Sequence, residues 1–167
     1  MEAVSIIDLL ELEPHPEEGG WFREIYRSCD SVTTPVLHER YGGDRIAGTA
    51  IYYLLTPDTF SAMHRLKSDE IFHFYMGDPV EQLLLYPDGR HDVHILGTDI
   101  EAGARPVSIV PAGVWQGARL VDGGKKALLG CTVSPGFEFE DYEHGNGIRL
   151  AAAYPECRSM IRALVAD

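Results

Sequence analysis

The sequence predicts an all-β protein built as an antiparallel sandwich or barrel. Between residues 49 and 134, apolar and β-branched segments of six to eight residues follow one another at regular spacing. Short clusters of proline, glycine and aspartate separate these segments. Many short strands punctuated by such turns are typical of sandwiches and barrels. We expect short helices only at the two ends of the chain.

The first 20 residues predict a helix followed by an irregular turn. Val4, Ile7 and Leu10 fall on one helical stripe, so residues 4–12 are expected to form a short amphipathic helix. The stretch EPHPEEGG at residues 13–20 cannot continue that helix, because it contains two prolines and a pair of glycines. The chain is therefore expected to turn before its first strand.

A strand is expected from Trp21 onwards, because the side chains there alternate in character. A regular strand would place Trp21, Arg23 and Ile25 on one face and Phe22, Glu24 and Tyr26 on the other. Residues 30–45 are polar and carry threonine and glycine, so we expect a long surface loop.

Eight further strands are expected at residues 49–56, 60–66, 70–76, 81–87, 91–97, 106–111, 114–121 and 127–134. Turn formers such as Pro87-Asp88-Gly89 separate them. The acidic run at residues 138–143 is expected to be a solvated face. Helical spacing predicts a helix over residues 156–165.

The composition is that of a globular protein with a core of its own, at 45% hydrophobic and 24% charged residues. The formal net charge of -12 repels phosphate backbones and anionic lipid, so nucleic acid and membrane partners are not expected. A small-molecule ligand remains the expected partner. No apolar run is long enough to span a bilayer, and the acidic N-terminus does not resemble a signal peptide.

Cysteine usage favours a reducing compartment. Cys29, Cys131 and Cys157 are odd in number, lie far apart and form no CxxC pair. We interpret them as free thiols, which predicts a cytoplasmic protein without disulfides or a thiolate zinc site.

Three polar residues on predicted strands are the main site candidates. His64, Glu70 and Gln116 fall among otherwise apolar positions, where a polar side chain is costly unless it is bonded or used. Converging in a barrel mouth, they could bind a metal ion or act as a base with its orienting groups. The alternative is a core histidine that is hydrogen-bonded to Glu70 and has no chemical role.

The stretch HRLKSDEIFHFYMG at residues 64–77 resembles the first motif of the cupins, G-x5-H-x-H-x3,4-E-x6-G. His64 matches the first histidine, Glu70 the glutamate and Gly77 the final glycine. In the second motif, G-x5-P-x-G-x2-H-x3-N, Pro111 and Gly113 match.

The departures from these motifs concern the metal ligands. Leu66 stands where the second motif histidine would be, and Gln116 stands where the last metal histidine would be. The resemblance implies a divalent metal in cupins that keep all four ligands, whereas this chain keeps one histidine and the glutamate. We therefore expect no bound metal, with a weak divalent site at His64, Glu70 and Gln116 as the alternative.

The ordered segments GGWFRE, HRxxxDExxHxYxG and PAGVWQ resemble a family of small cupins of unassigned function over about residues 5–145. This resemblance implies a single cupin domain over residues 1–167, a double-stranded β-helix or jelly-roll barrel that is usually a homodimer. Its fold is similar to that of the rhamnose-pathway sugar-nucleotide epimerases. Fold alone does not carry their activity over.

Four further residues are candidates for binding the ligand. Arg23 could form a bidentate contact with a carboxylate or phosphate, and Trp21 could stack on a ring of the ligand. The alternative is that both residues only stabilise the corner between the first strand and the loop that precedes it, which contains His15 and Glu18. Trp115 is either a pocket wall or part of the core. His73 would be a third ligand only if a bulge turned it inward, since strand parity points it away from Glu70 and into a possible dimer contact.

These expectations lead to a functional hypothesis. The cupin binds a small polar metabolite, sugar-, nucleotide- or acid-like, in its barrel. As an enzyme it would be a metal-independent isomerase or epimerase in which His64 removes a proton next to a carbonyl and Glu70 orients the ring. The alternatives are a non-catalytic ligand-binding cupin and a weak divalent-metal enzyme.

Overall fold

The structure, a computed structural model, describes residues 2–165. Its strands are β1 (Glu13–Pro14), β2 (Trp21–Arg27), β3 (Ser31–Val32), β4 (Arg45–Ile46), β5 (Thr49–Leu55), β6 (Ser61–Leu66), β7 (Asp69–Gly77), β8 (Val80–Leu85), β9 (His91–Leu96), β10 (Val107–Val110), β11 (Trp115–Leu120), β12 (Ala127–Ser134) and β13 (Tyr142–His144). Its helices are α1 (Ala3–Leu10), α2 (Gly147–Ala153) and α3 (Arg158–Ala163), with 3-10 turns η1 (Glu39–Tyr41), η2 (Phe139–Asp141) and η3 (Pro155–Cys157).

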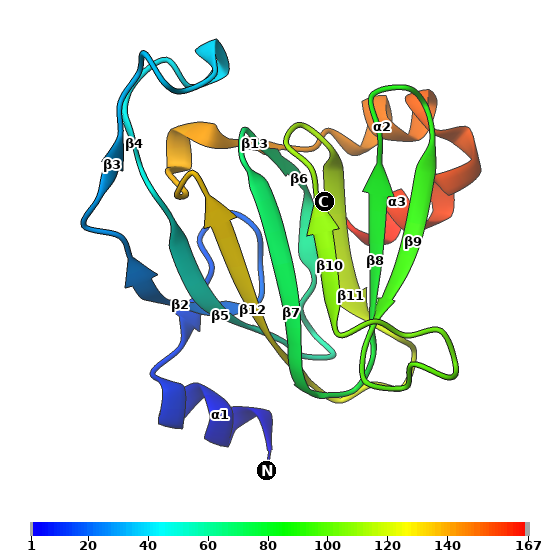
Figure 1. Cartoon of the computed structure of the whole chain (residues 1–167). Helices are drawn as coiled ribbons and strands as arrows, with labels where there is room; N and C mark the ends of the chain where they lie inside the picture. The colour runs from blue at the N-terminus through cyan, green and yellow to red at the C-terminus, as the bar shows by residue number, and fades with distance from the viewer. Residues whose placement is uncertain (1, 166–167) are drawn as a thin grey trace.

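Two antiparallel sheets form the body of the molecule (Figure 1). The first has six strands in the order β1-β2-β5-β12-β7-β10, and the second has five in the order β13-β6-β11-β8-β9. Strands β3 and β4 pair separately as a small ribbon. The double-sheet, all-β fold that the sequence predicts is confirmed.

Apolar side chains fill the space between the sheets. Tyr53, Phe72, Leu84 and Leu129 come from four different strands and are almost inaccessible to solvent. They alternate with outward-facing residues, as the pleat of a strand requires. Burying each such side chain contributes about 1.5–3 kcal/mol, so this layer is a main source of stability.

The helices lie outside the barrel, one group against each sheet. The outer face of the five-stranded sheet packs against α2 and α3, through Met63, Leu85 and Ile161 among others. Helix α1 packs on one end of the six-stranded sheet, against Leu54 and Leu128. No helix within residues 2–165 is long and apolar enough to cross a membrane.

Gly77 shows why one motif position has to be glycine. Its φ is +110°, and a Cβ there would lie 2.3 Å from the carbonyl oxygen of Lys126. Any other residue would clash with the backbone at the start of β12. The motif glycine therefore allows β7 to end and turn against its neighbour.

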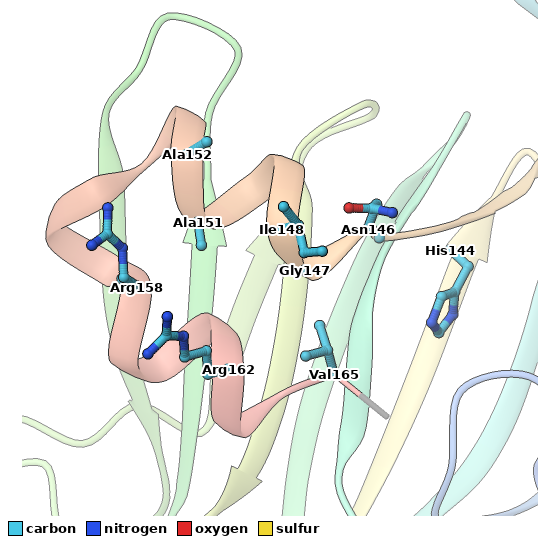
Figure 2. Close-up of a pocket in the computed structure, with 10 residues that line it drawn as sticks. His144, Asn146, Gly147, Ile148, Ala151, Ala152, Arg158, Arg162 and Val165 are labelled. Carbon is cyan, nitrogen blue, oxygen red and sulfur yellow. The ribbon is translucent and has the colours of Figure 1, made fainter. Parts of the chain in front are cut away.

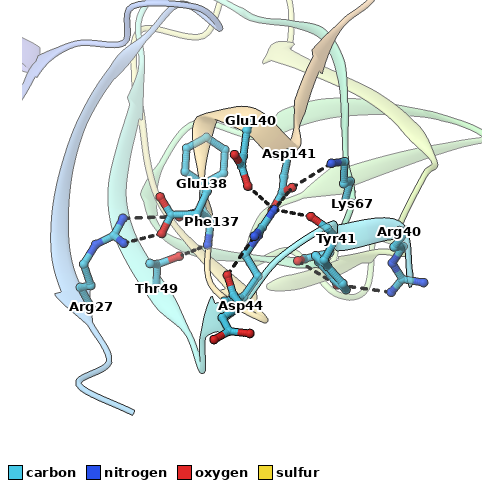
Figure 3. A network of polar contacts seen from close by, with 12 residues as sticks. Arg27, Arg40, Tyr41, Asp44, Thr49, Lys67, Phe137, Glu138, Glu140 and Asp141 are labelled. Atoms are coloured by element: carbon cyan, nitrogen blue, oxygen red, sulfur yellow. Dashed lines mark hydrogen bonds and ion pairs between the residues drawn. The ribbon is translucent and has the colours of Figure 1, made fainter. Parts of the chain in front are cut away.

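In the acidic run at residues 138–143, Glu140 and Glu143 are exposed, as expected of a solvated face, but Asp141 is buried. Asp141 is 4% exposed and forms an ion pair with the equally buried Arg45, with Nε to Oδ2 and Nη2 to Oδ1 distances of 2.7 and 2.8 Å (Figure 3). Lys67 lies 3.2 Å from the same carboxylate. Despite desolvation, which acts in the opposite direction, these contacts lower the pKa of Asp141. Asp141 thus ties η2 to strand β4.

Candidate functional site in the barrel interior

A cavity of about 80 Å³ opens into the barrel. Its inner wall is formed by Ile51, Leu66, Glu70, Cys131 and Val133. The loop before β2 contributes His15 and Glu18, and the rim is formed by Phe22, Glu24, Arg27, Thr49, Phe137, Glu138 and Phe139. At roughly 30 Å³ per water molecule in the liquid, this volume corresponds to about three water molecules. A ligand of a few heavy atoms fits this space.

Glu70 points into the barrel from β7, as strand parity predicts. Its Oε2 accepts a hydrogen bond of 2.6 Å from Nε2 of Gln116, whose Oε1 in turn accepts one of 3.4 Å from Gln82. All three side chains are buried. Burial, and after it the negative charge of Glu18, raises the pKa of Glu70 to about 7, although His64 and the Gln116 hydrogen bond act in the opposite direction.

His64 lies on β6 and is 1% exposed. Its Nδ1 is 2.7 Å from the carbonyl oxygen of Ala62 and must therefore carry the hydrogen. The ring of Tyr142 stacks on it, with centroids 5.1 Å apart and planes 17° apart. Ala62 and Tyr142 thus orient the imidazole, in place of the Glu70 contact that we expected. This leaves the Nε2 lone pair of His64 free.

Glu18 lies between the free nitrogens of two histidines. Its Oε2 is 3.7 Å from Nε2 of His64 and 3.9 Å from Nε2 of His15, while Oε1 accepts a hydrogen bond from Ser61. Nδ1 of His15 accepts the backbone N–H of Glu18 at 2.9 Å, so in the neutral ring Nε2 carries the hydrogen. Burial lowers the pKa of His15, which favours that neutral form.

The sequence pointed to the segment that carries His15 and Glu18 but not to these residues as the site. The paired glycines after Glu18 were the available signal. Gly19 and Gly20 both have positive φ, and a Cβ on Gly20 would lie 2.9 Å from the hydroxyl of Tyr53. Close packing of this turn brings His15 and Glu18 to the barrel.

The donor set does not fit a resident metal ion of the cupin type. Glu70 is bonded to the amide of Gln116, and Leu66 supplies no ligand. Nε2 of His15 is a donor in the neutral ring, because Nδ1 already accepts a backbone N–H. Within residues 2–165, no group of three or more histidine, cysteine, aspartate or glutamate side chains is arranged to hold a metal.

Three of the candidate ligand-binding residues lie outside the cavity. Arg23 donates to the carbonyl of Leu10 and pairs with Glu11 at 2.6 Å, so it caps the end of α1. Trp21 packs against the same helix. Trp115 packs under α2 and α3, with the guanidinium of Arg65 4.5 Å from its ring centroid. We therefore remove all three from the candidate pocket. Gln116 does not line the cavity either, but it is hydrogen-bonded to Glu70, which does.

His73 also faces outward, from the six-stranded sheet. Its Nε2 is 3.1 Å from Oγ1 of Thr132, and its ring stacks on that of Tyr75. Strand parity holds across Glu70, Phe72 and His73, so no bulge turns this imidazole toward the cavity.

Arg27 is the arginine that reaches the cavity. The pairing of β2 with β5 shifts between Glu24 and Tyr26, and this bulge places Arg27 opposite Thr49 on the cavity side. Its guanidinium pairs with Glu24 at 2.9 Å and with Glu138 at 2.8 Å. Simple alternation in the sequence could not predict this residue, because a bulge reverses the facing of every later side chain.

A second hollow of about 710 Å³ lies outside the barrel, beside α2 and α3 (Figure 2). Arg158 and Arg162 line it, and both are exposed. It contains none of the buried polar groups described above. The interior cavity is therefore the better candidate site.

The family profile described as "Cupin superfamily (DUF985)" matches residues 4–145. This chain belongs to that cupin family. The match spans the barrel and all of its polar interior, so the jelly-roll fold expected from the two motifs is confirmed.

Three relatives of this cupin carry no assigned function in their names. It is 34% identical over 137 residues to the uncharacterized protein YML079W of Saccharomyces cerevisiae, a match that covers 75% of this chain and 66% of the yeast protein, just under two thirds. The crystal structure of protein SO0799 from Shewanella oneidensis shares 34% identity and a TM-score of 0.87, covering 99% of this chain and 98% of that one. A hypothetical protein from Leishmania major shares 31% identity and a TM-score of 0.87 over the full length of both chains.

More distant structures show the fold alone. Oxalate decarboxylase from Bacillus subtilis is 15% identical to this chain, with a TM-score of 0.54. The match covers 93% of this chain and 37% of the decarboxylase chain. At this identity the comparison supports a shared cupin barrel fold, and it does not indicate a shared reaction.

Proposed function

We propose that this cupin binds a small, uncharged, polar metabolite inside its barrel. The observation that carries the proposal is a narrow cavity that contains a buried carboxyl group, Glu70, and a second carboxylate, Glu18. Burying a polar group without a hydrogen-bond partner lowers the stability of the fold, so polar groups on the wall of a buried cavity favour a ligand-binding role. A sugar nucleotide is much larger than the cavity, so we restrict the ligand to a few heavy atoms.

The charges around the cavity favour a neutral ligand over an acid. Two carboxyl groups repel an anion that enters the cavity, and Arg27 at the rim is already paired with Glu24 and Glu138. A hydroxyl or carbonyl compound can exchange hydrogen bonds with Glu18, Glu70 and His15 without carrying a charge into the barrel.

As an enzyme, this cupin would move a proton next to a carbonyl without a metal ion. His64 has a free Nε2 lone pair, and the pKa of Glu70 lies at about 7, where a carboxyl group can either give or take a proton. Glu70 would exchange a proton with the ligand in an isomerisation or epimerisation, and His64 would accept a proton that is relayed to it from the cavity. We expect His64→Ala to lose turnover, and an unchanged rate would rule out this mechanism.

Ligand-observed NMR tests the binding step. The probes are dihydroxyacetone and glyceraldehyde, with lactate and pyruvate as carboxylates of the same size. We expect saturation transfer from the wild-type protein to the two uncharged compounds and little to the acids. Transfer to the acids alone, or to none of the four, would contradict the proposal.

A non-catalytic binding cupin is the second candidate. The observation that favours it is the position of His64, which is 1% exposed and does not line the cavity. Binding of the probes without any change in their C–H bonds would support this candidate over the isomerase.

A further inference from the structure

We propose that Glu18 is the residue that exchanges a proton with the ligand. The imidazoles of His15 and His64 flank its carboxylate, and they orient it and exchange protons with it. This inference rests on the proposed function and identifies the residue at which its chemistry takes place. Glu18 and His15 line the cavity, whereas His64 does not. A proton that travels between the ligand and His64 therefore has to pass through Glu18.

The loop holds the Glu18 carboxylate in one orientation. The carbonyl of Glu18 accepts the N–H of Ala62 at 2.8 Å, and the carbonyl of Gly19 accepts the hydroxyl of Tyr53 at 2.8 Å. Ser61 donates to Oε1 over 2.5 Å. These bonds tie the loop to β5 and β6 and leave Oε2 as the free oxygen. A side chain held by several bonds to rigid strands is suited to a precise chemical role.

The two histidines differ in what they offer to Oε2. His64 presents a lone pair at Nε2, because its hydrogen is on Nδ1, whereas His15 presents Nε2–H. Their distances to Oε2, 3.7 and 3.9 Å, are about 0.5–1 Å longer than a hydrogen bond. Such contacts in a ligand-free site commonly shorten when the ligand is bound. Glu18 thus lies between one proton acceptor and one proton donor.

The ligand class that fits this arrangement is a neutral α-hydroxycarbonyl compound of three or four carbons. Glu18 takes the proton from the carbon next to the carbonyl, so the C–H bond breaks and an O–H bond forms on Oε2. The electron pair moves into the C–C bond, and the carbonyl oxygen takes a proton from the carboxyl group of Glu70. The product is an enediol, and no oxidant or reductant is needed.

The reverse steps complete an isomerisation. Glu18 returns its proton to the former carbonyl carbon, and Glu70 recovers a proton from the hydroxyl on the carbon that was first deprotonated, where the new carbonyl forms. Between the two half-reactions the lone pair of His64 can hold the proton of Glu18. All atoms are accounted for, and both carboxyl groups return to their starting states.

Deuterium exchange in D₂O tests this assignment, with dihydroxyacetone as the probe and NMR as the readout. We expect the wild-type protein to replace the C–H hydrogens of the probe with deuterium. Glu18→Gln should still bind the probe but exchange it at least about a hundredfold more slowly, which is the usual loss when an acid–base group is removed. The matched control is Glu17→Gln, which changes the exposed neighbouring residue and should exchange at the wild-type rate.

Glu18→Asp is the second test variant, for use if Glu18→Gln does not fold. It retains the carboxylate at a shorter reach and should restore part of the exchange. Separately, ¹⁵N NMR should find the hydrogen of His64 on Nδ1 and that of neutral His15 on Nε2, and Glu18→Gln should lower the pKa of His15 further, because the negative charge of Glu18 raises it.

The outcomes separate this inference from the proposed function. A wild-type protein that binds the probe without exchanging it, or a Glu18→Gln variant that exchanges at the wild-type rate, overturns the role of Glu18 and leaves ligand binding intact. A wild-type protein that binds neither dihydroxyacetone nor glyceraldehyde overturns both.

Discussion

Gln116 donates a hydrogen bond of 2.6 Å to Glu70 across the interior of the barrel, from the five-stranded sheet to the six-stranded sheet. In the motif resemblance Gln116 occupies the position of the last metal histidine. Here its amide satisfies the buried carboxyl group of Glu70 directly. Burial, followed by the negative charge of Glu18, raises the pKa of Glu70, and the hydrogen bond from the uncharged amide of Gln116 offsets this rise only in part.

The raised pKa of Glu70 predicts how stability depends on pH. Its ordinary pKa is 4.5, and in the folded protein the pKa is about 7. Between these values the unfolded chain has released the proton while the folded chain keeps it. The free energy of unfolding therefore falls as the pH rises from 4.5 to 7, by about 3 kcal/mol in total from this group.

Glu70→Gln should remove that dependence. We expect urea unfolding of this variant to show a smaller loss of stability between pH 5 and pH 8 than the wild-type protein does. The control is Glu101→Gln at an exposed turn, which should follow the wild-type curve. A loss of stability as large as that of the wild-type protein would show that Glu70 is not the group responsible.

The sequence predicts the strands of this barrel well, for a physical reason. Each of the eight expected segments between residues 49 and 134 overlaps one observed strand, because alternating burial and turn-forming residues are local properties. The parity argument for Glu70 and His73 holds for the same reason. Helix α2 is different, since its seven residues are too few to show a helical period.

The site residues that the sequence could not predict depend on contacts between distant segments. Arg27 replaces Arg23 at the cavity because a bulge in β2 reverses the facing of the strand. Glu18 reaches His64 because the loop before β2 folds across β6, which no spacing along the chain encodes. Trp115 shares a strand with Gln116 but faces the helices.

The ion pair between Arg45 and Asp141 is expected to contribute strongly to stability. Both side chains are almost fully buried, so Asp141→Asn would remove the buried charge that pairs with Arg45 and leave its guanidinium only the exposed carboxylate of Glu140. Removing one partner of a buried pair costs about 3–5 kcal/mol. Urea unfolding should show a loss of that order.

The control for this prediction is Asp88→Asn. Asp88 pairs with Arg90 at a similar distance of 2.7 Å but on the surface, where solvent screens the pair. We expect no measurable change in its unfolding curve. Equal effects of the two substitutions would contradict a special role for the buried pair.

The outer face of the six-stranded sheet predicts a homodimer. One row of cross-strand neighbours runs across it through Tyr26, Ala50, Thr132, Ile71 and Ile109. None of these residues is charged, although the chain as a whole carries a net charge of -12. Tyr75 lies over Gly130 on the same face and is 49% exposed, and Ile109 is 59% exposed. A row of uncharged side chains of this kind is suited to burial against a second copy of itself.

Substitution of this face by lysine tests the dimer. Ile109→Lys and Tyr75→Lys each place a charge where the two copies would meet, and burying an unpaired charge costs far more than the contact gains. Light scattering should therefore give the mass of two chains for the wild-type protein and of one chain for either variant. Ile148→Lys changes an apolar residue that is 86% exposed on α2, outside the other sheet, and should remain dimeric. A monomeric wild-type protein, or dimers that tolerate both lysines, would show that this face is not the interface.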